Sequence, residues 1–458
     1  MRVSWSDHSI DFHLKTSVSA LSWLHENIAS MRQIRLTIGI NLPRGMLQDV
    51  MKGSRNLTCL SIKSKKLKEM PPLPPQLQQL DLRGCCKLCS LPALPATLLR
   101  LLSSGYKLDN LPQLPQSLVE LELTECYSLQ QLPSLPDGLK RLSLKSCTKL
   151  SVLPELPVSL TRLDCSGCQS LEQLPPLART GITQLICSGC PWLKELPDMP
   201  SSLQRPNAEG LGSISTLPKL PAERLKVLHI SMTRISELPG SLPDLEELHC
   251  GFTPIRQLPA LPSCLTLNVD DCVSLKQLLL QLPPKLLRLV ARYCSGLLLE
   301  QLPTGLMYLH LDLNGCNELQ QLPAHLPAQL QTLKVSSCSA LQQLPEQLPA
   351  GLMYMDCSEC SELQQLRKQL PAGLVYLNCS HCSELQQLPA QLPAQLRTLN
   401  LEYCTALKQL PELPLTLQTL KCKGCRSLRQ RPKLAKCRVR KVSLKECDAL
   451  PGFKRARE

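Results

Sequence analysis

The residues best suited to chemistry in this chain are cysteines that occur in Cys-x-x-Cys pairs. The chain has 458 residues, of which 25 are cysteine. Two groups of four have eighteen residues between their pairs: Cys165, Cys168, Cys187 and Cys190, and then Cys357, Cys360, Cys379 and Cys382. Four thiolates at such spacing are typical of a structural zinc site. Disulfides are the other option, but an odd number of cysteines fits a secreted disulfide framework poorly.

A sequence repeat positions these cysteines. Each unit reads Leu-x-x-Leu-x-Leu-x-x-Cys-x-x-Leu and continues Leu-Pro-x-Leu-Pro, as in residues 118–136. We call the Cys of this phrase the ladder position; Lys65, Tyr106, Thr233 and Thr253 replace it in some units. The spacing from Lys65 to Cys447 averages about 21 residues and predicts about nineteen units over residues 57–450, one of them degenerate near 203–211. A period of this length specifies a solenoid.

The repeat favours a core role for most of the cysteines. Fourteen occupy the ladder position, and six occupy the last inward-facing strand position, where sibling units have Leu123 or Leu144. A free cysteine behaves as a small buried hydrophobe with a weak S–H donor, which at the turn can satisfy a neighbouring carbonyl. We therefore predict reduced thiols, no metal and no cofactor. Five cysteines fall outside both positions and are predicted to be the accessible thiols: Cys59, Cys86, Cys89, Cys264 and Cys437.

The same repeat predicts the secondary structure. In Leu-x-Leu the alternate side chains point inward, as in a half-buried strand, and stacking the units makes a parallel sheet on a concave face. The Leu-Pro-x-Leu-Pro segment is not helical, because proline at this density removes donors and clashes with preceding turns. It is predicted to run extended, near polyproline II, along the convex side.

The two ends differ from the array. Residues 1–56 are predicted to form an N-terminal cap with a helix over 17–31, where Val18, Leu21, Leu24 and Ile28 have helical spacing. The N-terminus lacks the pattern of a secretory signal, and no run of 18 apolar residues exists for a membrane span. Residues 451–458 form a basic tail.

The phrase Leu-Pro-x-Leu-Pro-x-x-Leu-x-x-Leu, as in residues 153–163, resembles the leucine-rich repeats of bacterial type III effectors, the IpaH/YopM class and the PopC-like effectors of plant pathogens. The resemblance covers roughly residues 57–450 and implies a protein-binding solenoid delivered into a host cell. The chain departs from that class in having mostly Cys where the class usually has Asn. Some IpaH-class members carry a ubiquitin-ligase domain with a Cys-x-Asp nucleophile. No cysteine here is followed by x-Asp, so ligase activity is not expected.

The solvent-facing strand positions lie six, four and two residues before the ladder position. With an allowance for a two-residue insertion near Leu313, tyrosine recurs at one concave position in Tyr308, Tyr354 and Tyr376. Tyrosine is enriched at binding hot spots, although recent duplication would also copy it without selection for binding. The predicted partner-binding residues are Tyr308, His310, Lys334, Tyr354, Asp356, Tyr376, Asn378 and Asn400.

The C-terminal end is strongly basic. Residues 421–458 contain fourteen Lys/Arg and three Asp/Glu, a net of +11 within the chain's +14. An import receptor, anionic lipid or nucleic acid could bind such a patch, but without interleaved aromatic residues nucleic acid is disfavoured. A charged cap on the last repeat is the simpler interpretation. The patch consists of Arg438, Arg440, Lys441, Lys445, Lys454, Arg455 and Arg457.

Together these features predict a non-enzymatic interaction scaffold, a translocated bacterial effector that binds a host protein through its concave face. Two alternatives stay open: the substrate-recognition part of a ubiquitin-ligase system, and a cytoplasmic regulatory repeat protein of the producing organism. The host-cell cytoplasm or nucleus is the expected location for the effector.

Overall fold

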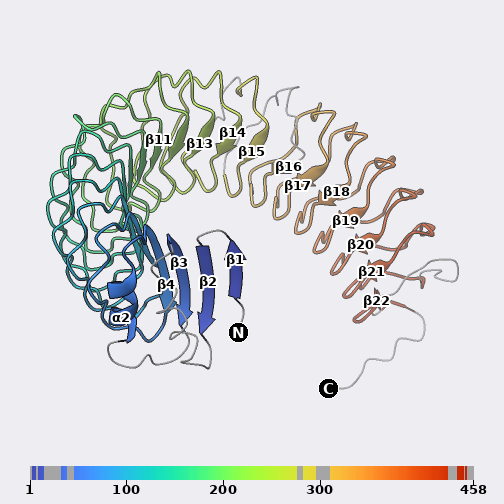
Figure 1. Cartoon of the computed structure of the whole chain (residues 1–458). Coiled ribbons are helices and arrows are strands. Elements are labelled where there is room, and N and C mark those ends of the chain that lie inside the picture. The colour runs from blue at the N-terminus through green and yellow to red at the C-terminus, as the bar shows by residue number, and fades with distance from the viewer. Residues whose placement is uncertain are drawn as a thin grey trace. The chain divides into compact units, whose positions relative to one another are not determined.

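The computed structural model describes residues 3–6, 9–14, 32–38, 46–275, 282–294, 310–431, 441–447 and 449–450. The chain divides into two units, Met1–Leu225 (unit 1) and Lys226–Glu458 (unit 2). Each unit is a stack of short strands (Figure 1), and from residue 57 onward there is one strand per repeat and no helix in the described segments between strands. The fold is a leucine-rich-repeat solenoid with a parallel sheet, as the repeat predicted.

Unit 1 begins with a cap and continues into the array. Its elements are β1 (Val3–Ser6), β2 (Ser9–Leu14), β3 (Gln33–Ile38), α2 (Met46–Gly53), β4 (Cys59–Ser64), β5 (Gln79–Leu82), β6 (Arg100–Ser103), β7 (Glu120–Leu123), β8 (Arg141–Ser143), β9 (Arg162–Asp164), β10 (Gln184–Ile186) and β11 (Arg205–Asn207). Strand β11 lies in the degenerate repeat near residues 203–211, where Leu203 and Leu211 are fully buried.

The described residues of unit 2 form strands, turns and irregular segments, with no helix. The strands are β12 (Val227–His229), β13 (Glu247–His249), β14 (Thr266–Asn268), β15 (Arg288–Val290), β16 (His310–Asp312), β17 (Thr332–Lys334), β18 (Tyr354–Asp356), β19 (Tyr376–Asn378), β20 (Thr398–Asn400), β21 (Thr419–Lys421) and β22 (Lys441–Ser443). No helix of the described residues in either unit is long and apolar enough to cross a membrane.

The cap contains two strands, β1 and β2, that the sequence did not predict. Strand β1 pairs antiparallel with β2, and β2 pairs in parallel with β3, which in turn pairs with β4. The signal was present in residues 9–14, where Ile10, Phe12 and Leu14 alternate with polar residues at the strand period. The predicted helix over 17–31 lies outside the described residues, and so do residues 451–458.

Leucine burial and the proline turn together close each repeat. In the repeat that contains β7, Leu118, Leu121 and Leu129 are fully buried. Burial of one such side chain stabilises the fold by about 1.5–3 kcal/mol. The Leu118 N–H donates to the Pro115 carbonyl at 3.1 Å, and the equivalent bond recurs at 3.1 Å from Leu139 to Pro136. The second proline of the phrase therefore supplies the acceptor of the turn that returns the chain to the sheet.

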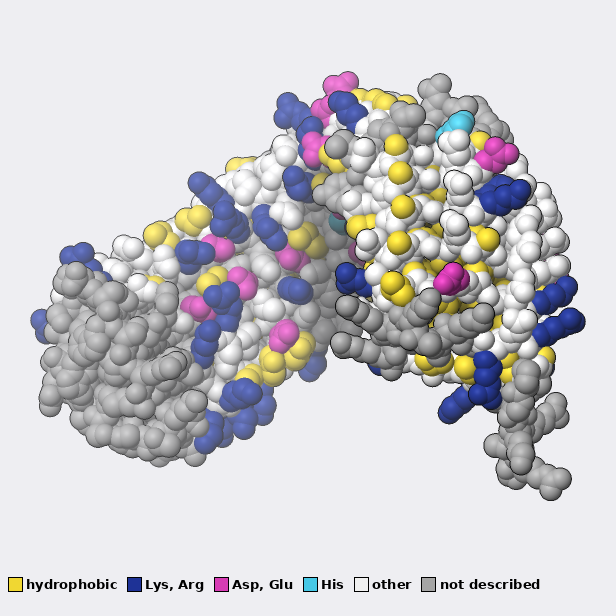
Figure 2. Space-filling model, turned by 90° about the vertical axis from the view of Figure 1, so that its right-hand side faces the viewer, with side chains coloured by type: hydrophobic (Ala, Val, Ile, Leu, Met, Phe, Trp, Pro, Cys, Tyr) yellow, Lys and Arg dark blue, Asp and Glu magenta, His cyan; other side chains and the backbone are white. Residues whose placement is uncertain are grey.

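Between the strands, the return segments of the described array contain no helix. Some stack in parallel register on their neighbours, as the bridge between Gln321 and Gln343 shows. Figure 2 shows hydrophobic side chains of the described residues as small groups among polar ones on the face drawn. The lack of helix in the described return segments fits the predicted exclusion of helix by proline.

The ladder cysteines act as buried hydrogen-bond donors. The Cys338 Sγ lies 3.1 Å from the Leu313 carbonyl oxygen of the preceding repeat, and the Cys382 Sγ lies 3.0 Å from that of Cys357. All fourteen ladder cysteines are fully buried. Except at Cys126, whose Sγ lies 3.9 Å from the Thr124 carbonyl of its own repeat, the accepting carbonyl belongs to the last inward strand position of the preceding repeat, so these thiols join neighbouring repeats. The core interpretation of the ladder cysteines is confirmed.

Three assignments from the sequence were wrong at this level. Lys65 and Tyr106 are exposed, and the ladder site of the Tyr106 unit is taken by Gly105, whose carbonyl accepts the Leu108 N–H at 3.1 Å. The turn after β6 is therefore one residue shorter than the repeat suggested. Cys264 is fully buried rather than accessible, with its Sγ 3.2 Å from the Thr266 carbonyl. Cys437 lies outside the described residues.

Candidate functional site

The concave face of each unit is lined by the side chains that alternate with the buried leucines. In unit 2, strands β16 to β20 pair in parallel and in register. One row of residues therefore runs His310, Thr332, Tyr354, Tyr376 and Thr398, six residues before the ladder position. A second row runs Asp312, Lys334, Asp356, Asn378 and Asn400.

Two of the predicted tyrosines meet on this face. The rings of Tyr354 and Tyr376 stack with centroids 4.2 Å apart and an angle of 3° between their planes. Both residues are half-buried. Burial of the phenol, and the neighbouring Tyr376 after it, raise the pKa of Tyr354 well above its ordinary value, so the Tyr354 hydroxyl stays neutral at physiological pH. The pair presents a preformed aromatic platform with polar tips.

The register of Tyr308 was wrong in the sequence analysis. The allowance for a two-residue insertion placed Tyr308 in line with Tyr354, but β16 pairs His310 directly with Thr332. His310 therefore occupies the row position, and the tyrosine row contains two members instead of three. Tyr308 itself lies outside the described residues. The backbone of His310 is placed by β16.

The polar residues of the second row largely hold turns. The Asp356 carboxylate accepts the Ser358 N–H at 3.0 Å and the Asn378 side-chain N–H at 3.1 Å. Asn378 and Asn400 are each only 9% exposed, and each accepts an N–H two residues further on. Asp and Asn favour such local turns. Among the described side chains of the predicted set, Lys334 presents the most accessible charge; its side chain is 40% exposed and its Nζ lies 3.8 Å from Asp312.

Unit 1 has a charged hollow that the sequence analysis did not identify. A cavity of about 530 Å³ lies on its concave face over strands β7 to β10. Its lining includes Glu120, Arg141 and Asp164. Glu120 pairs with Arg100 at 2.6 Å and with Arg141 at 3.9 Å. The available signal was the alternation of acidic and basic residues at equivalent strand positions in successive repeats.

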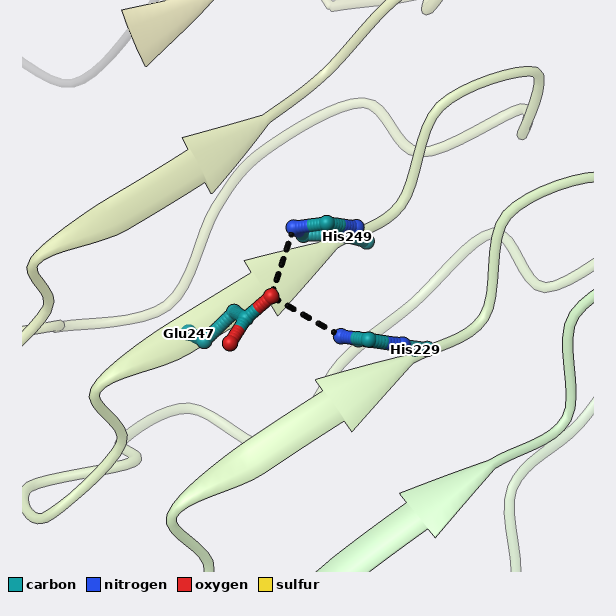
Figure 3. Close-up of side chains that lie close together, drawn as sticks. All are labelled: His229, Glu247 and His249. Carbon is teal, nitrogen blue, oxygen red and sulfur yellow. Dashed lines mark hydrogen bonds and ion pairs between the residues drawn. The ribbon is translucent and has the colours of Figure 1, made fainter. Parts of the chain in front are cut away.

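A cluster of two histidines and a glutamate was also missed. The Nε2 atoms of His229 and His249 lie 3.2 and 3.0 Å from the same Oε1 of Glu247 (Figure 3). The two imidazole rings stack with centroids 4.3 Å apart and an angle of 14° between planes. The signal in the sequence was histidine four residues before the ladder position in two consecutive units, at Thr233 and Thr253.

The remaining sites from the sequence analysis are placed only in part. Cys165, Cys168, Cys187 and Cys190 are all buried, and Cys168 and Cys190 donate to carbonyls of preceding repeats at 3.2 and 3.1 Å. They pack as core residues in the way their repeat positions predicted. Of the basic patch, Lys441 and Lys445 are exposed near β22, and its other members lie outside the described residues.

Comparisons with known proteins agree with this architecture. The chain is similar in structure to YopM from Yersinia enterocolitica WA-314, with a TM-score of 0.65 and 28% identity over 93% of this chain and 94% of that one. YopM from Yersinia pestis, a leucine-rich effector protein, gives a TM-score of 0.41 and 24% identity over 93% of this chain and 98% of its own. No protein-family model and no curated protein matches the chain. The resemblance inferred from the Leu-Pro phrase is confirmed as a structural match to YopM.

Proposed function

We propose that this protein is a non-enzymatic scaffold that binds a protein partner through the concave face of unit 2. The observation that carries the proposal is the stacked Tyr354–Tyr376 pair. Tyrosine contributes large contact area with a polar tip and is over-represented among residues that dominate binding energy. Because the two rings already support each other, less side-chain freedom is lost when a partner binds.

The surroundings of the pair support the same function. The Asp356–Asn378 hydrogen bond and the turns that these residues close hold the neighbouring strands in place. Lys334 supplies a partly exposed charge beside Asp356, at the rim of the aromatic pair. An aromatic centre with a charged rim matches the usual anatomy of a protein interface. A solenoid is suited to this role because its stacked repeats form a continuous binding surface.

We further propose that the partner is a host protein and that the chain reaches it as an effector through a type III-like route. The structural match to YopM and the Leu-Pro phrase support this assignment. A reporter fusion measured in host cells, with bacteria that have or lack the secretion apparatus, tests the route. Delivery that is independent of the apparatus contradicts it and favours the regulatory repeat protein.

The binding face is tested by affinity capture from host lysate. The wild type is compared with the double variant Tyr354→Ala/Tyr376→Ala and with a control, Val273→Ala/Leu415→Ala. Val273 and Leu415 are 56% and 63% exposed and lie outside the strands. Loss of two hot-spot aromatics is expected to weaken binding by at least about 2 kcal/mol, roughly 30-fold, while the control binds as the wild type. Equal recovery by the double variant and the wild type contradicts the assignment, provided their circular dichroism spectra agree.

A further inference from the structure

We propose that His229, Glu247 and His249 form a binding site for one divalent transition-metal ion, with zinc as the best fit. The site belongs to strands β12 and β13 of unit 2 (Figure 3). It is separate from the tyrosine pair and does not depend on the proposed partner binding.

Strand register brings the three side chains together. Strands β12 and β13 pair in parallel, with His229 directly opposite His249. Glu247 precedes His249 by two residues, so the pleat directs both side chains to the same face. The ligand atoms of all three residues lie within 4.8 Å of one another. Two neighbouring repeats of unit 2 therefore contribute to one cluster, and no loop has to fold over it.

The distances are close to those of a tetrahedral ion. With metal–ligand bonds of about 2.0–2.1 Å, ligand atoms in a zinc tetrahedron lie roughly 3.3–3.4 Å apart. The two Nε2–Oε1 separations are 3.2 and 3.0 Å. The two Nε2 atoms lie within 4.8 Å of each other, and binding requires the stacked rings to turn so that both Nε2 lone pairs converge on the ion.

The donor chemistry selects the kind of metal. Two imidazoles and one carboxylate are the donor set of many zinc sites that keep an open fourth position. Imidazole suits zinc, copper and nickel, whereas magnesium and calcium prefer oxygen ligands alone. The next strand places neutral Thr266 and Asn268 opposite Glu247 and His249, so no cation from β14 opposes the ion.

The histidines also depart from the pattern of the repeat. At the equivalent position Asp356, Asn378 and Asn400 use their short side chains to close the following turn. In two successive repeats, His229 and His249 instead direct their rings toward Glu247 (Figure 3). A simple hydrogen-bonded cluster is the alternative, in which both rings donate a proton to the carboxylate. The hydrogen-bonded cluster predicts that the three residues do not bind added metal, whereas the proposed site predicts that they bind one ion.

The site is accessible to an ion from solvent. The side chains of His229, His249 and Glu247 are 22%, 30% and 36% exposed. An ion can therefore enter without local unfolding. The open fourth position faces the concave surface, where water or a donor atom of a bound molecule completes the coordination.

Cobalt(II) titration of the full chain tests the proposal, because its absorption spectrum distinguishes nitrogen and oxygen ligands from thiolates. The protein is stripped of metal, kept reduced with a phosphine, and compared with His229→Gln/His249→Gln and with His325→Gln. His325 is an exposed histidine of the same unit and serves as the matched control. Zinc competition against the bound cobalt then gives the zinc affinity.

The expected result is one cobalt ion per wild-type chain, with a visible spectrum that lacks a thiolate charge-transfer band. The double variant is expected to lose affinity by about 100-fold or more, because removing even a second-shell partner costs 10–100-fold. The His325→Gln control should retain the wild-type affinity. Absence of binding, equal affinity in all three proteins, or a thiolate band overturns the proposal.

Discussion

The ladder thiols are predicted to hold neighbouring repeats together by hydrogen bonds, and Cys338→Ala tests this most simply. Cys338 is fully buried and its Sγ lies 3.1 Å from the Leu313 carbonyl oxygen. That carbonyl has one other partner, the Cys316 N–H at 3.4 Å, so the substitution leaves it weakly satisfied.

The magnitude follows from two contributions. Loss of a hydrogen bond to a partly satisfied buried acceptor costs about 0.5–1.5 kcal/mol. Removal of the sulfur from the core costs about as much as removal of a buried methylene, ~0.8 kcal/mol. We therefore expect Cys338→Ala to lower the free energy of unfolding by about 1.3–2.3 kcal/mol. With a denaturant slope of about 3 kcal/mol/M, the urea midpoint falls by about 0.4–0.8 M.

The assay is urea unfolding followed by far-ultraviolet circular dichroism, with midpoints compared between variants. Cys338→Asn is expected to recover part of the loss, because its amide can donate to the same carbonyl. Cys86→Ala is the matched control, since Cys86 is only half-buried and its Sγ lies 3.8 Å from the Gly84 carbonyl. Its cost should stay below about 0.5 kcal/mol. A Cys338→Ala midpoint equal to that of Cys86→Ala would refute the hydrogen-bond role of the ladder.

Three further predictions follow from the structure. Burial raises the pKa of Cys85 and of Cys264 to about 11 from 9.0, so their contribution to stability is complete below pH 9 and is lost as the pH rises toward 11. As the pH rises through that window, each thiol should reduce the free energy of unfolding by about 1.4 kcal/mol per pH unit. The melting temperature of Cys85→Ala should therefore fall less steeply with pH than that of the wild type, and equal slopes contradict this. Among the described residues, the half-buried Cys59, Cys86 and Cys89 should react fastest with an alkylating reagent under native conditions. Mass spectrometry after brief alkylation measures this, and rapid labelling of the ladder cysteines would contradict the burial of those cysteines. Glu120→Gln should lower stability by no more than about 1 kcal/mol in low salt, because the Arg100 side chain of its ion pair is 43% exposed, and the difference should shrink in 1 M salt.

The repeat made most of the fold predictable from the sequence. Leucine at fixed spacing identified the buried strand positions, and proline density excluded helix from the return segments. The register failed where a unit departs from the consensus. The turn after β6 is one residue shorter than its neighbours, which put Tyr106 outside and Gly105 inside. Strand pairing decides such cases, and a single sequence does not contain it.

The candidate sites were predictable only in part, because they depend on contacts across strands. Tyr354 and Tyr376 were found from their shared position in consecutive repeats. The sequence did not show that Asn378 and Asn400, although on the concave face, are nearly buried and accept backbone N–H groups two residues further on. His229 and His249 share a repeat position just as the tyrosines do, but their significance depends on Glu247, which lies at a different position and reaches both rings only through the strand register.

The central claim is that a protein partner binds the concave face of unit 2, and site-specific photo-cross-linking tests it most directly. A photoreactive phenylalanine at Thr398 lies in the row beside Tyr376 and leaves both tyrosines intact. The same group at Leu415 lies in a Leu-Pro return segment and is well exposed. We predict a covalent partner adduct from position 398 and none from position 415. An adduct from position 415 alone, or equal yields at both positions, would contradict the claim.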